Sequence, residues 1–349
     1  MRKTLFFSVI WFSFFLVGLT ETVEAQSESN DTTKFTVLEI SDIPYANAKG
    51  YWTHLATEST VFNKISMMKE ATDEQQLGLC LDLFLPLDDS LRDHPLVMLI
   101  HGGAFYFGSK DDVALRQWCQ HIASQGFVAA SIDYRTGFLP TAAHIQRAGY
   151  RALQDAHAAL RYLVSRHDTF TIDTSLIVVG GCSAGAITAL NLAYMTNDMR
   201  PEYTYEGSGF GDLGAIDTCG NDIRTDFKIK GVIDMWGALP DTAMMRGHDT
   251  PILAIHGDAD DIVPYGHDYP FGAAGAMKSL FSDKMYGSSC IVEQAHKTGV
   301  PARLVTLEGQ KHAPHYDPQT HEITEYFYVI QDAMDEFLKL LVKSNSTEP

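Results

Sequence analysis

The fold is decided by the stretch Leu176-Ile177-Val178-Val179-Gly180-Gly181-Cys182-Ser183-Ala184-Gly185-Ala186-Ile187-Thr188-Ala189-Leu190. It predicts a buried strand, a sharp turn with Ser183 at its apex, and a helix. Because Gly181 and Gly185 have no side chains, the strand and the helix can approach each other closely beside the serine. The helix N-terminus would then offer free N–H groups to a developing oxyanion. The pattern predicts a nucleophilic serine, although Gly- and Ser-rich turns of this length also arise by chance.

Apolar runs on both sides of this stretch predict the rest of a sheet. They cover residues 35–40, 77–85, 96–100, 127–134, 229–236, 251–256 and 302–307. Helical patterns cover residues 111–125 and 146–167, the segment after the turn to about Thr196, and the C-terminal stretch. This alternation predicts an α/β fold with a mostly parallel central sheet covered by helices on both faces.

Ligands bind at the carboxyl edge of such a sheet. The loops after Ile100, Gly180, His256 and Leu307 should therefore meet there, although they are far apart in the sequence. Two stretches without a clear period, residues 197–228 and 265–300, leave from the same edge. Loops of this length are usually functional or disordered, so we expect them to form a lid or a pocket wall. The alternative is that they only decorate the surface.

A serine nucleophile needs a histidine base, and the base needs a carboxylate to orient it. The predicted order along the chain is serine, acid, histidine. Three carboxylates, Asp258, Asp260 and Asp261, follow the strand at 251–256. Asp260 is the preferred acid because it lies shortly beyond the strand end, and the other two are expected to hydrogen-bond the turn. Aspartates are common in turns, so all three could have that role alone.

The predicted base is His312, in the loop between the last strand and the last helix. His315 competes with it, and with 14 histidines in the chain any single one is more often a surface residue than a catalyst. An oxyanion hole needs converging backbone N–H groups. We expect them from Ala184 and from Gly103 and Ala104 in the glycine-rich turn after Ile100, although His-Gly-Gly can also be an ordinary tight turn.

In these residues the chain resembles the α/β-hydrolase superfamily, in particular its carboxylesterases and hormone-sensitive-lipase-like esterases. The resembling segments lie between residues 77 and 315: Leu81–Pro86, Ile100–Phe105 with Gly108-Ser109, Ser131–Arg135, Asp155 with Ala158–Tyr162, Gly180–Ala186, and the Asp260 and His312 loops. The resemblance implies Ser183 as nucleophile, Asp260 as acid and His312 as base. It also implies that Gly103, Ala104 and Ala184 form the oxyanion hole.

The chain departs from these relatives in two places. Lipase-like members usually have a third glycine where Ala104 stands, but the backbone donor survives that change. The acid loop, with His-Gly before it and Val-Pro after it, looks more like that of prolyl-peptidase-type relatives. We therefore expect a serine hydrolase that cleaves a small-molecule or lipid-like carboxylic ester without metal or cofactor. A peptidase or amidase with the same triad is the alternative, and a non-catalytic binding protein on this fold is a more distant one.

The N-terminus has the features of a signal peptide. Arg2 and Lys3 precede the apolar run 5–19, and Val23-Glu24-Ala25 offers small residues at a cleavage position. Cleavage would leave a chain starting near Gln26, secreted or periplasmic and without a membrane span. An uncleaved membrane anchor is the alternative, although the apolar run is short for one.

Residues 26–349 are then expected to form one α/β-hydrolase domain. The chain has five cysteines, Cys80, Cys119, Cys182, Cys219 and Cys290. In an oxidising compartment some of these could pair, and Cys219 with Cys290 is the preferred pair because both lie in loop-like insertions. A formal net charge of -18 argues against nucleic acid and anionic membranes as partners. The sequence does not indicate an oligomeric state.

Overall fold

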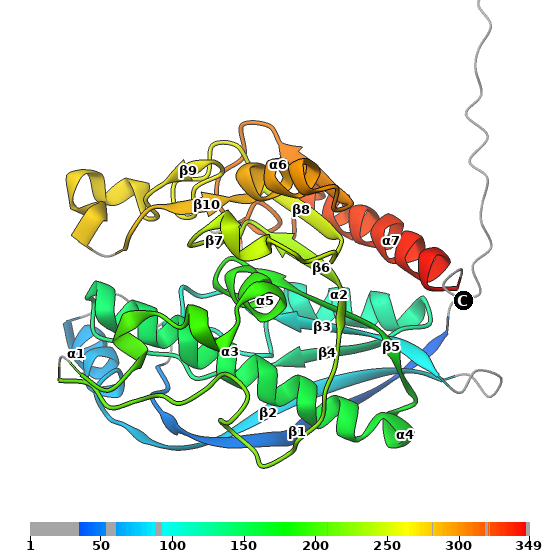
Figure 1. The fold of residues 1–349 in the computed structure, drawn as a ribbon, viewed down its shortest axis with the longest axis horizontal. Helices are drawn as coiled ribbons and strands as arrows, with labels where there is room; N and C mark the ends of the chain where they lie inside the picture. The colour runs from blue at the N-terminus through cyan, green and yellow to red at the C-terminus, as the bar shows by residue number, and fades with distance from the viewer. Residues whose placement is uncertain are drawn as a thin grey trace, which may run out of the picture. The chain divides into compact units, whose positions relative to one another are not determined.

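An eight-stranded sheet runs through the computed structural model (Figure 1). The structure describes residues 35–53, 61–87, 93–207, 209–280, 282–317, 320 and 322–346. The strand order is β1-β2-β4-β3-β5-β6-β8-β11. The strands are β1 (Thr36–Gly50), β2 (Gln75–Leu87), β3 (His94–Ile100), β4 (Val128–Ile132), β5 (Ile172–Cys182), β6 (Ile229–Met235), β8 (Ile252–Gly257) and β11 (Ala302–Leu307). The predicted signal peptide, residues 1–25, lies outside the described residues.

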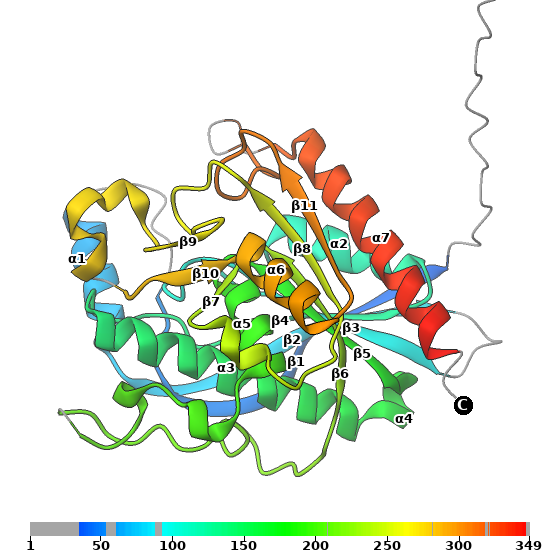
Figure 2. The same cartoon turned by 45° about the horizontal axis from the view of Figure 1, so that its top comes forward.

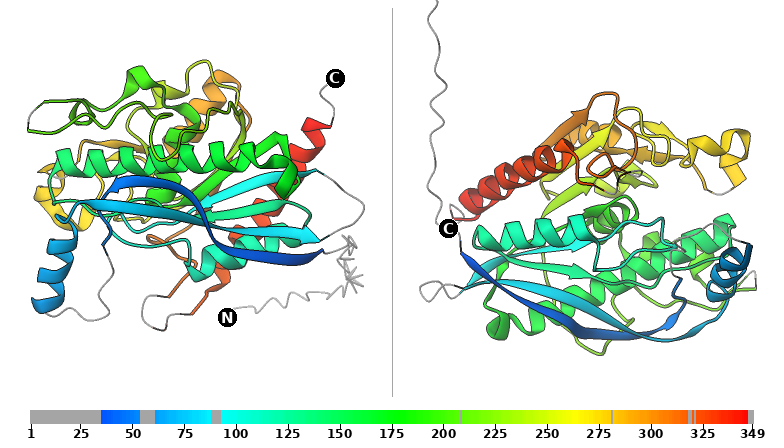
Figure 3. Two further views of the ribbon diagram at one scale, coloured as in Figure 1. Left: turned by 90° about the horizontal axis from the view of Figure 1, so that it is seen from below. Right: turned by 180° about the vertical axis from the view of Figure 1, so that it is seen from behind.

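The sheet is parallel from β4 to β11, whereas β1 and β2 are antiparallel to each other and β2 is antiparallel to β4, at one edge of the sheet. Seen from below, β1 and β2 are the long strands that curve along one side of the sheet (Figure 3, left). A smaller antiparallel sheet joins β7 (Ala238–Leu239), β10 (Met285–Gly287) and β9 (His267–Asp268). The predicted mostly parallel sheet is therefore confirmed, with an antiparallel edge and a small second sheet that the alternation did not indicate.

Helices cover both faces of the large sheet. One face carries α3 (Ala142–Ser165), α5 (Ala184–Tyr194) and α6 (Ser288–Thr298). The other carries α2 (Val113–Ser124) and α7 (Glu325–Asn345), and α7 packs along β8 and β5 (Figure 2). The short helices α1 (Val61–Glu70) and α4 (His167–Phe170), with η1 (Asn197–Met199), η2 (Glu202–Thr204), η3 (Thr242–Met245) and η4 (Gly272–Leu280), lie in the connections.

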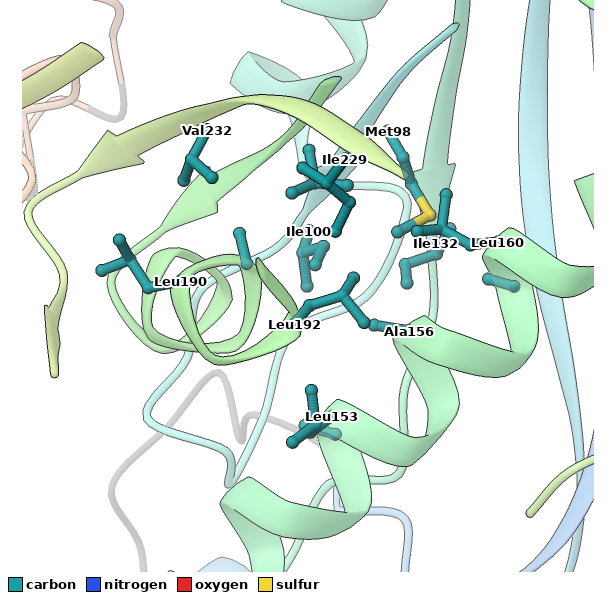
Figure 4. Packing of buried hydrophobic residues seen from close by; sticks show 14 of the residues in the cluster. Met98, Ile100, Ile132, Leu153, Ala156, Leu160, Leu190, Leu192, Ile229 and Val232 are labelled. Atoms are coloured by element: carbon teal, nitrogen blue, oxygen red, sulfur yellow. The ribbon is translucent and has the colours of Figure 1, made fainter. Parts of the chain in front are cut away.

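Two hydrophobic clusters hold these layers together, one on each face of the sheet. Successive residues of β3 enter different clusters, because side chains alternate along a strand. Leu96, Met98 and Ile100 join α3 and α5 in the first cluster, and Val97 and Leu99 join α2 and α7 in the second. Figure 4 shows part of the first cluster, in which side chains of β3 and β4 lie opposite Leu153, Ala156, Leu160, Leu190 and Leu192 of the two helices.

Candidate active site

The turn between β5 and α5 places Ser183 at the carboxyl edge of the sheet. Ser183 has φ 55° and ψ −118°, a region that residues with side chains rarely adopt. A strained residue of this kind costs roughly 1–3 kcal/mol and persists only where its surroundings enforce it. Here the Ser183 N–H donates to the carbonyl oxygen of Met235 on β6 at 2.9 Å. The strain turns the hydroxyl out of the backbone, as the sequence pattern predicts for a nucleophile.

Two glycines make this turn possible. A Cβ atom on Gly181 would lie 2.5 Å from the Ile100 carbonyl oxygen and 2.6 Å from the Gly185 carbonyl carbon. A Cβ atom on Gly185 would lie 2.0 Å from the same Ile100 oxygen. Both distances are far below van der Waals contact, so β3, β5 and α5 can meet here only through backbone atoms.

Two hydrogen bonds link Ser183 to His312 and His312 to Asp260. The Nε2 atom of His312 lies 2.9 Å from Ser183 Oγ, and its Nδ1 atom lies 2.7 Å from Asp260 Oδ2. The residues come from the β5–α5 turn, the loop after β11 and the loop after β8. Residues that are 129 positions apart in the chain therefore meet at one edge of the sheet. This geometry fits proton transfer from the serine to a histidine whose far nitrogen is held by a carboxylate.

Among the three candidate acids only Asp260 contacts His312. Its other oxygen accepts hydrogen bonds from the N–H groups of Ile262 at 2.8 Å and Val263 at 3.0 Å. Asp258 instead accepts from the Gly309 N–H at 2.6 Å, and Asp261 lies 3.3 Å from the Lys311 ammonium. Both of these carboxylates therefore stabilise the neighbouring loops.

Competing effects act on the ionisation of Asp260, whose side chain has no exposed surface. Burial by itself raises the pKa of a carboxyl group, because it disfavours the charged form. Hydrogen bonds from His256, His312 and the Ile262 N–H outweigh this burial and hold the pKa of Asp260 well below its usual range. Asp260 is therefore ionised wherever His312 can act as a base.

The expected oxyanion donors lie beside the serine. Ala184 is the first residue of α5, so its N–H has no partner within the helix. Ala104 and Ala184 line the same cavity as Ser183. Gly103 has φ 109°, and a Cβ there would lie 2.0 Å from the Phe107 carbonyl oxygen, so this turn requires a glycine.

A cavity of about 850 Å³ opens above Ser183. Its wall near the serine includes Phe105, Ile187 and Val263, and most of the lining is apolar. Both long insertions contribute to it. The lining residues from them are Met199, Pro201, Glu202, Tyr203, Pro270, Phe271, Ser282, Asp283, Lys284 and Met285. The two stretches without a clear period therefore form part of the wall of the site.

His315, the competing base, is buried between two tryptophan rings. Its ring stacks on Trp236 with centroids 5.1 Å apart and lies 5.2 Å from the Trp118 ring. Burial lowers its pKa to about 4, and nearby His312 adds to that effect. His315 therefore acts as a neutral core residue at ordinary pH.

The expected Cys219–Cys290 disulfide is wrong, because all five cysteines are free thiols. Cys219 Sγ accepts a hydrogen bond from Arg135 at 3.2 Å, and Arg135 is paired with Asp155 of α3. Cys290 lies on α6, which packs against β8 and β11. Sequence spacing could not reveal that the two insertions place their cysteines against different helices.

The described part of the chain has no group of three or more His, Cys, Asp or Glu side chains arranged to hold a metal ion. None of its helices combines the length and the apolar composition that a membrane crossing requires.

Sequence comparisons place the chain near known esterases. The BD-FAE family model matches residues 81–247, which include Ser183 but neither Asp260 nor His312. The Gut esterase 1 of Caenorhabditis elegans is 30% identical over 125 residues, which are 34% of this chain and 22% of that protein. The chain thus spans less than a quarter of the length of that relative in the alignment.

Solved structures share the fold over most of the chain. A thermophilic esterase from Thermogutta terrifontis with bound butyrate has a TM-score of 0.53 and 20% sequence identity, covering 76% of this chain and 90% of that one. A truncated carbohydrate esterase from gut microbiota has a TM-score of 0.50 and 19% identity, covering 91% and 99% of the two chains. At this identity the likeness establishes the shared fold.

Proposed function

We propose that this chain, which has the α/β-hydrolase fold, is a serine hydrolase that cleaves carboxylic esters through an acyl-enzyme. The observation that carries the proposal is the hydrogen-bonded series Ser183–His312–Asp260 next to a largely apolar cavity. The esterases named among the relatives and the structural neighbours support the reaction class.

In the first half of the reaction, Ser183 Oγ attacks the ester carbonyl carbon while His312 Nε2 takes its proton. The carbonyl π bond opens and leaves a negative oxygen, which the N–H groups of Gly103, Ala104 and Ala184 would stabilise. His312 then returns the proton to the leaving alcohol as the ester C–O bond breaks. The acyl group remains on Ser183.

In the second half, His312 takes a proton from water and the resulting nucleophile attacks the acyl-enzyme. Collapse of the second tetrahedral intermediate returns the proton to Ser183 and releases the acid. Asp260 stays ionised and stabilises the His312 imidazolium during both halves, since it is already ionised in the resting enzyme. No step requires a metal ion or an organic cofactor.

The cavity supports a substrate with an apolar part near the serine. Ile187, Met195 and Phe271 line its wall, and polar groups such as Gln146 and Tyr203 are also present. A short acyl chain, as in the butyrate bound to the thermophilic esterase, and a carbohydrate ester, as the name of the gut enzyme suggests, are both within the proposed class.

The test is a comparison of ester and amide substrates. A series of p-nitrophenyl esters of increasing acyl length should be hydrolysed, and aminoacyl-anilides should be turned over far more slowly. Faster cleavage of the anilides would favour a peptidase or amidase with the same triad. No labelling by an organophosphonate would favour a non-catalytic binding protein.

We further propose that residues 1–25 direct export and are removed. The basic residues Arg2 and Lys3 before an apolar run support this. N-terminal sequencing of the protein recovered outside the cytoplasm should give a chain that starts near Gln26. Recovery of the intact N-terminus in a membrane fraction would favour an anchor instead.

A further inference from the structure

A second histidine contacts the catalytic acid besides His312. His256 lies at the end of β8 and has no exposed surface. Its Nε2 atom is 3.2 Å from Asp260 Oδ2 and also 3.2 Å from the Val263 carbonyl oxygen. A carbonyl oxygen and an ionised carboxylate can only accept, so Nε2 must carry a hydrogen atom. The Nε2–H group of His256 therefore donates to the Val263 carbonyl oxygen and also lies within ion-pair distance of the Asp260 oxygen that accepts from His312.

The other ring nitrogen of His256 leads into a chain of buried polar groups. Its Nδ1 atom is 2.7 Å from Ser288 Oγ on α6, and Ser288 Oγ is 2.6 Å from Asp234 Oδ2 on β6. The second Asp234 oxygen accepts from the Gly237 N–H at 2.7 Å. Asp234, Ser288 and His256 all have 0% exposure. Because these three side chains are buried and the series is hydrogen-bonded at both ends, the positions of its protons are constrained.

Only two proton arrangements satisfy these contacts. If Asp234 is ionised, Ser288 donates to it and must accept from Nδ1–H, so His256 is an imidazolium. If Asp234 is protonated, it donates to Ser288, which donates to a neutral His256 at Nδ1. Burial raises the pKa of Asp234, against the opposing effects of the Ser288 hydrogen bond and the His256 ring. Both arrangements carry the same number of protons: one more than ionised Asp234 with neutral His256 would have. In both, His256 Nε2 carries a hydrogen atom on the side of the ring near Asp260.

We propose that His256 is a positioning residue for the catalytic acid, and that Ser288 and Asp234 fix its ring so that its N–H always faces Asp260. This proposal rests on the proposed esterase function and deepens it. The N–H groups of Ile262 and Val263 hold one oxygen of Asp260, while the other accepts from His312 and lies 3.2 Å from His256 Nε2. His256 thus reduces the negative potential that Asp260 exerts on His312, and loss of His256 should favour the protonated form of His312.

Few titratable groups surround His256. Among the described residues, the titratable groups that face it are Asp260 on the loop after β8, Asp234 on β6, and Tyr265. The Tyr265 ring meets the His256 ring edge to face at 5.6 Å, and its hydroxyl is 2.7 Å from Thr306 Oγ1 of β11. His256 makes no hydrogen bond to Ser183, and its connection to the serine through side chains runs by way of Asp260 and His312.

The test compares His256→Leu, which has no donor, with His256→Gln, whose side-chain amide can still donate toward Asp260. The acid limb, which is the fall of kcat/KM at low pH, reports proton uptake by the His312–Asp260 pair. In the Leu variant this limb should move to higher pH by roughly 0.5–1 unit, with kcat about tenfold lower and KM within about twofold. The Gln variant should return the limb to near its wild-type position. Thermal unfolding of each variant shows which are folded.

Ser288→Ala serves if His256→Leu does not fold, because it removes only a hydroxyl. Without the Ser288 hydroxyl the His256 ring is held less firmly. The acid limb of kcat/KM should therefore move in the same direction as in His256→Leu, by a smaller amount. A folded Leu variant with the wild-type pH profile would overturn the proposal, as would a Gln variant that behaves like Leu. If Leu is unfolded, a wild-type profile for Ser288→Ala would do the same.

A separate readout distinguishes this proposal from the esterase function. With ¹⁵N-labelled histidine imidazoles, the His312 resonance can be assigned by its loss in His312→Gln and followed against pH. Its midpoint should lie higher in His256→Leu, or in Ser288→Ala if Leu is unfolded, than in the wild type, whether or not an ester is hydrolysed. A wild type that neither turns over esters nor reacts with a phosphonate would contradict the proposed function, while an unchanged midpoint would contradict the role of His256.

Discussion

Gly185 lies directly against Ile100: a Cβ atom on the glycine would come within 2.0 Å of the isoleucine carbonyl oxygen. This contact joins the first turn of α5 to the end of β3, where the glycine-rich turn with Gly103 and Ala104 begins. Ser183 and the expected oxyanion donors are therefore positioned by the same backbone contact. A change at Gly185 should affect both together.

Gly185→Ala should reduce kcat strongly and lower the melting temperature, because backbone atoms of β3 and α5 must separate to admit the methyl group. We expect a loss of about 2 kcal/mol or more in the free energy of unfolding, as in other overpacked cores. Gly78→Ala in β2 is the matched control, since a Cβ there meets nothing within 4 Å. Equal stability and activity of the two variants would contradict the close contact.

Asp260→Asn should reduce kcat by roughly 10³–10⁴-fold, because an amide can no longer stabilise the His312 imidazolium. Asp258→Asn and Asp261→Asn should retain activity within about threefold, since their carboxylates contact Gly309 and Lys311. The comparison uses kcat for one p-nitrophenyl ester at pH 8. A large loss in Asp258→Asn with little loss in Asp260→Asn would move the acid to the other residue.

His315 should make the protein less stable at acid pH. Its folded-state pKa is about 4, below the 6.5 of an exposed histidine, so the unfolded chain binds a proton first as the pH falls. Stability is therefore full above about pH 6.5 and declines toward pH 4, by up to about 3 kcal/mol from this residue. Buried His101, with a pKa of about 4, acts in the same direction.

The variant that isolates this effect is His315→Phe, which fills the space between Trp236 and Trp118 without a titrating group. Urea unfolding at pH 4.5, 5.5 and 7 should give a shallower decline in the variant than in the wild type. An equally steep decline in both would show that His315 does not titrate in this way.

Gly149 on α3 lines the cavity, so substitutions there can probe the substrate's acyl chain. A Cβ atom there would lie 3.6 Å from the Phe105 ring, which is ordinary contact. Gly149→Ala should therefore stabilise the helix by about 0.5–1 kcal/mol and leave short esters unaffected. Gly149→Leu should extend into the cavity and lower kcat/KM more for octanoate than for acetate esters. If Gly149→Leu has the same preference between octanoate and acetate esters as the wild type, the acyl chain does not lie beside Gly149.

Much of the fold could be predicted because local signals agree with it. The run 302–307 has the bounds of β11, and Gly126 follows the end of α2 as a helix stop signal predicts. The strand–turn–helix around Ser183 was predictable because its glycines are dictated by the backbone contact at Ile100. The antiparallel pairing of β1 with β2 was not, because strand direction depends on how the chain returns between them.

Some residues of the candidate site could likewise be predicted from the sequence, and others could not. Ser183, Asp260 and His312 follow strands and lie at one sheet edge, so their meeting was foreseeable from topology. Ser288 and Asp234 carry no such signal: one begins a helix within an insertion, and the other lies in a strand like any buried aspartate. Only the three-dimensional packing brings both to His256, for which the sequence indicates no more than a place at the end of a strand.

The proposed role of Ser183 is tested by labelling with an organophosphonate, followed by mass spectrometry of the intact protein and its peptides. We expect one phosphonyl group on Ser183 of the wild type, loss of ester hydrolysis in step with labelling, and neither labelling nor hydrolysis in Ser183→Ala. A Ser183→Ala variant that still hydrolyses esters, or a wild type labelled at another residue, would contradict it.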